Sequence, residues 1–194
     1  MKRGWMKLWI CVSLLPAGLC IAASSPAAQR SLHRANETLL AGLRPGHDTL
    51  AVAEKRFKSK KAADIQDSGI KEWRDECSGR AIRLELNSKS VIQSVTITTL
   101  ESQEGKCGEK HLDFLDPKNW VTGEGLRIGD SQDRILGFYG EPNSSGPAAK
   151  NGKELDLMYY QFDWAGSEVP QVMEVLCARD TGRVVEITLA FPSL

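Results

Sequence analysis

The sequence predicts an α+β protein built from two tandem helix–three-strand units, which form antiparallel sheets with the helices on one face. Three observations lead to this fold class. The segment Gly-Leu-Arg-Pro-Gly at residues 42–46 recurs as Gly-Leu-Arg-Ile-Gly at residues 125–129. Each copy begins a short helical pattern, and each is followed by segments that alternate apolar and polar residues with the period of a β-strand. An internal repeat of this kind indicates one supersecondary unit used twice.

One short helix is expected after each copy of the repeat. These helices cover residues 50–57 and 133–139, and a further N-terminal helix is expected over 29–41. Asp48 and either Asp130 or Ser131 are suitable N-cap residues, because their side-chain oxygens can accept the free backbone N–H groups of a first helical turn. Gly140 and Pro142 end the second helix, since glycine suits a helix C-terminus and proline cannot continue the helix.

Three strands are expected in each unit. They cover residues 70–76, 81–87 and 91–99 in the first unit, and 155–163, 171–179 and 183–191 in the second. Such a unit packs its helix on one face of an antiparallel sheet and leaves the other face free. Two units side by side form either one long curved sheet or two small sheets, and the sequence leaves both alternatives open.

Residues 1–23 have the features of a secretory signal peptide. Lys2, Arg3 and Lys7 form a positive start, an apolar stretch follows over residues 8–21, and small residues come next. The rest of the chain is then organised as an N-terminal helical segment (24–41), a first αβββ repeat (42–99), a linker (100–119) and a second αβββ repeat (120–194).

A membrane anchor is the alternative interpretation of this N-terminal stretch. Pro16 and Gly18 interrupt the apolar run, which is also shorter than the roughly 20 residues that a membrane span needs. Lipidation is not expected, because Leu19 and not a small residue precedes Cys20. We therefore expect an exported protein, periplasmic or secreted after cleavage of the signal peptide.

The charge of the chain does not suggest a nucleic-acid binder. Without the three basic residues of positions 1–23, 22 basic and 25 acidic residues remain, a net charge of −3. One basic cluster is present, formed by Lys55, Arg56, Lys58, Lys60 and Lys61. It suits an anionic lipid or polymer surface, or it is a solvated helix end whose cations favour the C-terminal helix dipole.

Three cysteines follow the predicted signal peptide. Cys77 precedes one expected strand and Cys107 follows the next strand along the chain. These positions meet in an antiparallel hairpin, so a Cys77–Cys107 disulfide is expected in an oxidising compartment. Cys177 is then left unpaired, either as a small buried apolar residue or in an intermolecular bridge.

The repeat resembles two known families. The Gly46 and Gly129 turns, the Gly140–Pro142 helix end and the strand order are similar to the SmpA/OmlA (BamE-like) family of small outer-membrane lipoproteins. Tandem use of the unit in an exported chain resembles the β-lactamase inhibitory protein (BLIP-like) family. The resemblance covers residues 40–99 and 122–191, and it implies protein binding without catalysis. The lipid-anchor context of the first family and an inhibitor-loop motif of the second are both missing, so β-lactamase is not implied as a partner.

The strands of the second unit suggest a binding face. Residues 155–164 and 172–178 are apolar on both faces, whereas the first unit alternates with polar residues. Tyrosine and tryptophan are frequent anchors of interfaces. The candidate partner-binding residues are Trp73, Tyr159, Tyr160 and Trp164. In the alternative, the N-terminal helix or the 100–119 linker covers this face.

No catalytic, cofactor or metal motif is found in the sequence. His33, His47 and His111 are widely separated. His111 with Asp113 and Asp116 suits weak metal binding, although a solvated linker is the favoured interpretation. We expect a non-enzymatic module that binds a protein partner through its exposed sheet face. The alternatives are a small-ligand or envelope-polymer binder that uses a cleft between the repeats, and a hydrolase whose site assembles in space.

Overall fold

The computed structural model describes residues 36–58, 63–64, 69–100, 113–162 and 171–191. These residues all belong to the unit that spans Leu32–Leu194. Several sequence predictions therefore lie outside the described residues, namely the signal peptide, residues 29–35 of the N-terminal helix, Lys60, Lys61, Cys107, His111 and Trp164.

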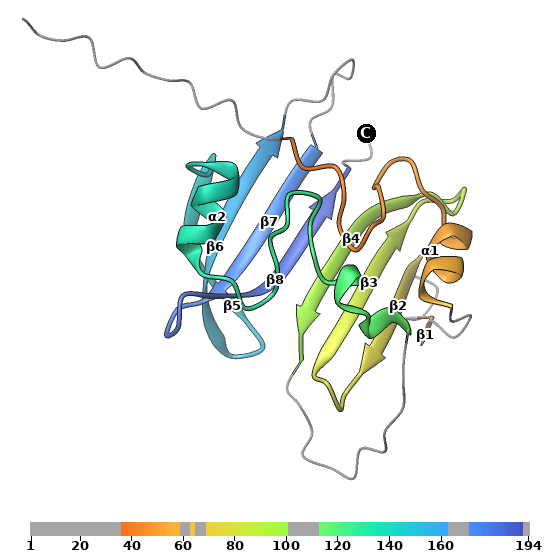
Figure 1. The fold of residues 1–194 in the computed structure, drawn as a ribbon, viewed down its shortest axis with the longest axis horizontal. Helices are drawn as coiled ribbons and strands as arrows, with labels where there is room; N and C mark the ends of the chain where they lie inside the picture. Colours follow the sequence, from red (N-terminus) through yellow and green to blue (C-terminus); the bar gives the residue numbers. More distant parts are fainter. Residues whose placement is uncertain (1–35, 59–62, 65–68, 101–112, 163–170, 192–194) are drawn as a thin grey trace, which may run out of the picture. The chain divides into compact units, whose positions relative to one another are not determined.

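The strands of the structure form one eight-stranded antiparallel sheet, in the order β1-β2-β3-β4-β8-β7-β6-β5 (Figure 1). The strands are β1 (Ala63–Asp64), β2 (Ile70–Asp75), β3 (Arg80–Leu86), β4 (Ile92–Thr99), β5 (Ser144–Lys150), β6 (Lys153–Phe162), β7 (Gln171–Ala178) and β8 (Arg183–Ala190). Strand β4 pairs with β8, so one continuous sheet is formed and not two small ones. With its helices, this sheet gives the predicted α+β class.

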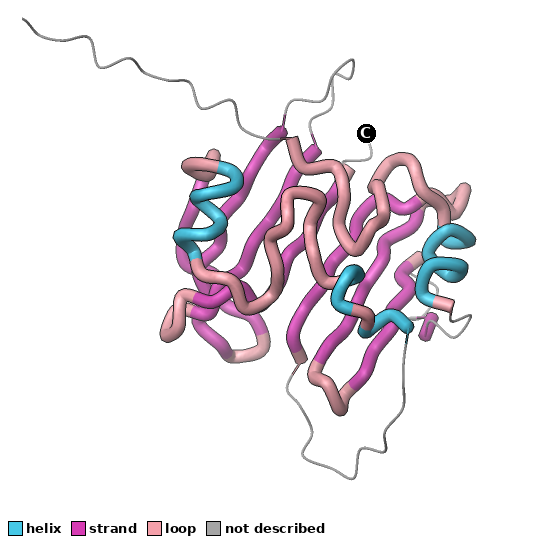
Figure 2. The backbone as a smooth tube through the Cα atoms, viewed as in Figure 1, coloured by secondary structure: helices cyan, strands magenta, loops and turns pink. Residues whose placement is uncertain are grey.

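Both α-helices lie over the same face of the sheet (Figures 1 and 2). Helix α1 (Leu50–Phe57) and helix α2 (Gln132–Tyr139) match the predicted helices, and two short 3-10 helices are added, η1 (Asp113–Leu115) and η2 (Pro117–Asn119). The core fills the space beneath them, where the ring of Phe57 packs edge-on against Trp73 with centroids 4.9 Å apart. In the described part of the chain, no helix combines the length and the apolar character needed to cross a membrane.

The two glycine loops that precede the helices make equivalent hydrogen bonds to the sheet. The N–H of Gly46 donates to the carbonyl of Ile92 (2.7 Å), and the N–H of Gly129 donates to the carbonyl of Val184 (2.8 Å). Both glycines have positive φ, +77° and +89°, which side chains other than glycine rarely adopt. A Cβ on Gly46 would also lie 2.7 Å from the ring of Phe191.

The acidic residues of these loops close the loops and do not cap the helices. The carboxylate of Asp48 accepts the N–H of Arg44 (2.8 Å) and that of Asp130 accepts the N–H of Arg127 (2.9 Å). The helix N-cap positions are held by Thr49 and Ser131, neither of which makes a side-chain capping bond. Asp48 and Asp130 are therefore not the N-cap residues, because each carboxylate is engaged within its loop. The predicted alternative, Ser131, does occupy the N-cap position of α2.

The described end of the predicted N-terminal helix is not helical. Leu40 bridges to Leu43 and to Thr122, so residues 36–41 lie as an extended segment against the loop before α2. Glu37 fixes this segment. Its buried carboxylate accepts the backbone N–H groups of Leu39, Gly123 and Glu124 (2.9–3.0 Å) and the hydroxyl of Tyr139 (2.7 Å). These bonds, all long-range except that from Leu39, replace the hydrogen bonds that a helix would have supplied.

Two further differences from the predicted elements concern an edge strand and the linker. The predicted strands omit β5, whose Gly146 and Pro147 disfavour a strand. Pro147 is tolerated there because β5 is an edge strand and needs hydrogen bonds on one side only. The end of the predicted linker joins the core, because Phe114 is buried there. Its carbonyl accepts the indole N–H of Trp120 (2.9 Å), and Trp120 is the buried first residue of the predicted second repeat.

Candidate functional site: the open face of the sheet

One face of the sheet carries no helix in the described part of the chain, and we call it the open face (Figure 1). Side chains alternate between the two faces of a strand. Trp73 and Ile82 belong to the core, so Glu72 and Arg83 point to the open face. The strand registers place seven such residues in one line across the sheet, which we call the central row. It runs Glu72, Arg83, Thr96, Thr188, Glu174, Tyr159 and Ser144.

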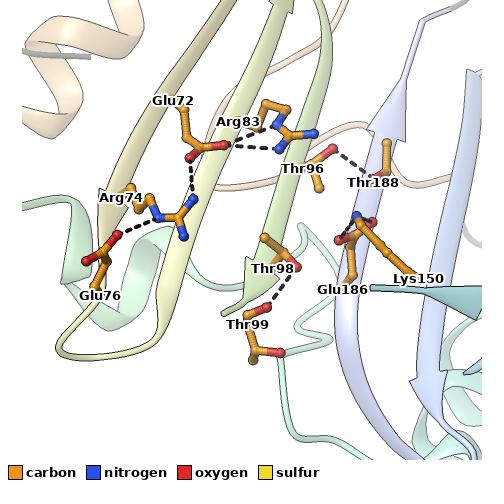
Figure 3. A network of polar contacts seen from close by, with 10 residues as sticks. All are labelled: Glu72, Arg74, Glu76, Arg83, Thr96, Thr98, Thr99, Lys150, Glu186 and Thr188. Atoms are coloured by element: carbon orange, nitrogen blue, oxygen red, sulfur yellow. Dashed lines mark hydrogen bonds and ion pairs between the residues drawn. The ribbon is translucent and has the colours of Figure 1, made fainter. Parts of the chain in front are cut away.

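The N-terminal half of the central row is polar and internally paired. The Nε and Nη2 atoms of Arg83 both donate to one carboxylate oxygen of Glu72, at 3.2 Å each. The hydroxyls of Thr96 and Thr188 are 2.9 Å apart and join β4 to β8 (Figure 3). The Glu72 side chain is only 8% exposed while that of Arg83 is 42% exposed. This part of the row therefore presents a neutralised, hydrogen-bonded surface.

A second ion pair bridges over the open face. The amino group of Lys150, at the end of β5, donates to the carboxylate of Glu186 on β8 at 2.7 Å (Figure 3). The Lys150 side chain is 43% exposed and the Glu186 side chain 10%. Only the lysine end of this pair is open to water, because the Glu186 carboxylate is largely buried. The main consequence of the pair is local, because it neutralises a carboxylate of the open face.

The C-terminal half of the open face is largely apolar. Tyr159, Leu157, Leu176 and Val172 are half-buried, and their positions alternate with the core residues of β6 and β7. Glu174 is exposed in their midst. The difference between the halves, polar in the first and apolar in the second, follows the pattern of the two sets of strands in the sequence.

Two of the four predicted partner-binding residues are core residues. Trp73 is 2% exposed and Tyr160 is 0% exposed, so neither can be presented to a partner, and the prediction was wrong for both. Tyr160 packs instead under α2, with its hydroxyl donating to the carbonyl of Gly140 (3.1 Å). Trp164 lies outside the described residues. Tyr159 is the predicted residue that the structure places on the open face.

The segments expected as alternative covers of this face lie elsewhere, as far as they are described. Residues 36–49 (orange) and 113–131 (green) run along the helix-bearing face (Figure 1). Their buried side chains join the core beneath the helices, as Leu43 and Leu126 do. The described parts of the N-terminal segment and of the linker therefore leave the open face uncovered.

A pocket of about 400 Å³ lies on the helix side of the second half. Its walls come from α2, the turn after α2, the β5–β6 hairpin and the turn after β7. They include Gln132, Leu136, Glu141, Pro147, Asp156 and Arg179. Arg179 is paired with Asp156 and Glu154, each at 3.1 Å. The pocket is not a cleft between the two halves, which join through continuous pairing of β4 with β8.

The basic cluster is only partly described. Lys55 and Lys58 are exposed at the end of α1, and Lys58 pairs with Asp113 at 3.4 Å. The guanidinium of Arg56 packs on Gly42, where an added Cβ would lie about 2.2 Å from it. Lys58 and Arg56 thus have contacts within the fold, and an anionic partner for the cluster stays a prediction.

The two acidic residues considered with His111 for weak metal binding are engaged in other contacts. Asp113 pairs with Lys58, as above, and Asp116 pairs with Lys118 at 2.9 Å. Hydrogen bonding from Lys118 lowers the pKa of the Asp116 carboxyl below its ordinary value. Within the described ranges, no group of three or more histidine, cysteine or acidic residues could hold a metal ion.

The predicted disulfide involves one described cysteine. Cys77 lies exposed in the turn between β2 and β3. The N–H of Leu100 donates to the carbonyl of Gly79 (2.7 Å), so the chain leaves β4 beside this turn on its way to Cys107. Because Cys107 is outside the described residues, the Cys77–Cys107 pairing stays a prediction.

Cys177 is a free, buried cysteine. Burial, followed by the Asp156 carboxylate, raises the pKa of its thiol from 9.0 to about 11. We expect Cys177 to resist iodoacetamide in the native protein and to react in urea, because the thiolate is the nucleophile. Mass spectrometry of the Cys177 peptide measures this, and equal labelling in both states contradicts it.

Between pH 9 and 11 the Cys177 thiol ionises in the unfolded chain before it ionises in the native protein. Rising pH therefore lowers the stability of the fold in this range.

No family model matches the chain, and no curated protein matches it. Among solved structures, the chain is similar to a DUF4309 family protein from Bacillus subtilis, with 9% sequence identity and a TM-score of 0.45. The alignment covers 78% of this chain and 83% of that protein.

Proposed function

We propose that this chain is an exported, non-enzymatic module that binds another protein through the open face of its sheet. The observation that carries the proposal is the difference between the two faces of the sheet. One face is covered by the helices and forms the core, whereas the other presents half-buried apolar side chains around Tyr159 beside a polar band. Aromatic side chains within an apolar surround are typical anchors of protein interfaces.

The rigidity of the face supports this proposal. Each strand of the sheet apart from the two edge strands is hydrogen-bonded on both sides. The hydroxyls of Thr96 and Thr188 add a side-chain hydrogen bond between β4 and β8. A surface that is already ordered loses little conformational entropy when it binds. The sheet therefore suits recognition of a partner without rearrangement.

We also propose that the two halves are copies of one unit. The equivalent bonds of Gly46 and Gly129, the positions of α1 and α2 before their strands, and the pairing of Thr96 with Thr188 support it. With a second copy, the sheet is twice as wide as one unit could build. Duplication thereby widens the open face that a protein partner can contact.

Export is the part of the proposal that rests on the sequence. The positive start, the apolar run and the small residues within 1–23 support a signal peptide. A Cys77–Cys107 bridge would suit an oxidising compartment and would stabilise the fold by roughly 3–4 kcal/mol in the chain-entropy model.

Capture of a partner tests the proposal. We expect the immobilised chain from residue 24 onward to retain a protein from native envelope extract, and the Tyr159→Ser variant to lose it. The matched control is Val52→Ser, because Val52 is 44% exposed on α1, away from the open face. Retention by wild type and by the Val52 variant, but not by the Tyr159 variant, supports binding at the open face. Equal retention by all three proteins contradicts it.

A second candidate function is binding of a small ligand in the pocket beside α2. The pocket of about 400 Å³ has the size of a small-molecule site and combines apolar walls with Arg179 and two carboxylates. A ligand that binds only the native state raises the melting temperature. Stabilisation by a small-molecule panel in wild type, lost on Leu136→Trp substitution at the pocket wall, would favour this candidate.

A further inference from the structure

We propose that Glu174 is the docking residue of the open face, and that the partner presents an arginine side chain among apolar neighbours. This inference rests on the protein-binding function proposed above and names the chemistry of the partner. It follows from the charge, the surroundings and the place of Glu174 in the central row.

Glu174 is an exposed carboxylate with apolar or aromatic side chains on three sides and Thr188 on the fourth. It lies in the middle of β7, opposite Tyr159 on β6 and Thr188 on β8. Val172 and Leu176, two residues away on either side, share its face and are half-buried. No described side chain forms an ion pair or a hydrogen bond with the Glu174 carboxylate.

The equivalent place in the first half shows what Glu174 lacks. Arg83 pairs with Thr96 and Glu72 in register, as Glu174 pairs with Thr188 and Tyr159. The charge of Arg83 is neutralised within the sheet by Glu72 at 3.2 Å, and Glu186 on β8 is neutralised by Lys150. Among the charged residues of the central row, Glu174 alone has no counter-ion in the described part of the chain. Its carboxylate is therefore available to a cation of a partner.

Arginine fits this place better than lysine. Its guanidinium can donate two hydrogen bonds to one carboxylate and can stack on an aromatic ring, and Tyr159 is the register neighbour of Glu174. Apolar contacts around such a pair exclude water and strengthen the pair, as at interface hot spots. The partner segment is therefore expected to carry leucine-like side chains next to the arginine.

The test uses the chain from residue 24 onward and two synthetic probes. One probe is a fluorescent extended peptide that alternates leucine and arginine. The other replaces each arginine by citrulline, which keeps the shape and removes the charge. Anisotropy titrations compare wild type with Glu174→Gln and with the control Glu85→Gln. Glu85 is also an exposed carboxylate of the open face, but its register partner on β4 is the polar Ser94.

We expect the arginine peptide to bind wild type and the Glu85 variant equally, and to bind Glu174→Gln about tenfold more weakly, as suits loss of a hydrogen bond to a charged group. The citrulline peptide should bind the wild-type protein as weakly as the arginine peptide binds Glu174→Gln. Equal weakening by both variants, or no binding to wild type, overturns the inference. A partner captured from envelope extract through Tyr159 that is insensitive to Glu174→Gln also overturns it, yet leaves the proposed function standing.

Discussion

The Glu37→Ala variant is expected to melt roughly 10 °C below the wild-type protein. Glu37 is 1% exposed, and its carboxylate holds three backbone N–H groups and the hydroxyl of Tyr139. Alanine leaves these donors without their acceptor, at a cost of about 3 kcal/mol, and a chain of this size loses about 2–4 °C per kcal/mol. The loss also releases the extended N-terminal segment from the loop before α2.

Thermal unfolding followed by circular dichroism measures this effect. Glu124→Ala is the matched control, because only the backbone N–H of Glu124 enters the cluster and its side chain is exposed. Tyr139→Phe should have a smaller effect, since it removes one donor and keeps the backbone bonds of Glu37. Burial, and next the charge of Glu37, raise the pKa of the Tyr139 hydroxyl, so this donor stays protonated. Equal melting of the Glu37 and Glu124 variants would refute the structural role of Glu37.

Tyr160→Ala and Tyr159→Ala are expected to differ sharply although the residues are neighbours. The Tyr160 ring lies 5.7 Å from that of Tyr139 and 6.3 Å from that of Phe162, and its removal should cost about 3–5 kcal/mol. Tyr159 lies on the open face, where truncation should cost about 1 kcal/mol. Urea unfolding of both variants measures the difference.

The same two variants distinguish an effect on folding from an effect on binding. Tyr159→Ala should lower the urea midpoint only slightly and lose the captured partner. Tyr160→Ala should lower the midpoint, and any loss of binding should follow the unfolded fraction. A Tyr160→Ala protein that is as stable as the wild type but no longer binds would indicate that Tyr160 contacts the partner. That result would contradict the placement of its ring in the core.

The adjacent tyrosines also show where sequence analysis reached its limit. Helices 50–57 and 133–139 and the six strands followed from periodicity and turn residues, and the structure places α1, α2 and the corresponding strands there. Strand β6, however, has apolar residues on both faces, and a shift of one residue exchanges the faces. Periodicity could therefore identify the strand but could not tell which tyrosine faces the core.

Other features were not predictable because they depend on distant residues. Glu37 contacts Gly123 and Tyr139, which are 86 and 102 residues away, and no local pattern signals such a contact. Strand β5 forms despite Gly146 and Pro147, because the hairpin with β6 supplies its hydrogen bonds. The lack of a counter-ion at Glu174 became visible only when the strand registers placed it beside Tyr159 and Thr188.

The position of β8 has a consequence for the order in which the protein folds. It is the last strand along the chain, yet it lies in the middle of the sheet beside β4. The Thr96–Thr188 contact spans 92 residues, and contacts of such long range slow folding. Until β8 is synthesised and docks, β4 remains a bare strand edge, which is a template for pairing with other chains. The interval before that docking is when the protein is most exposed to aggregation, however stable the finished sheet is.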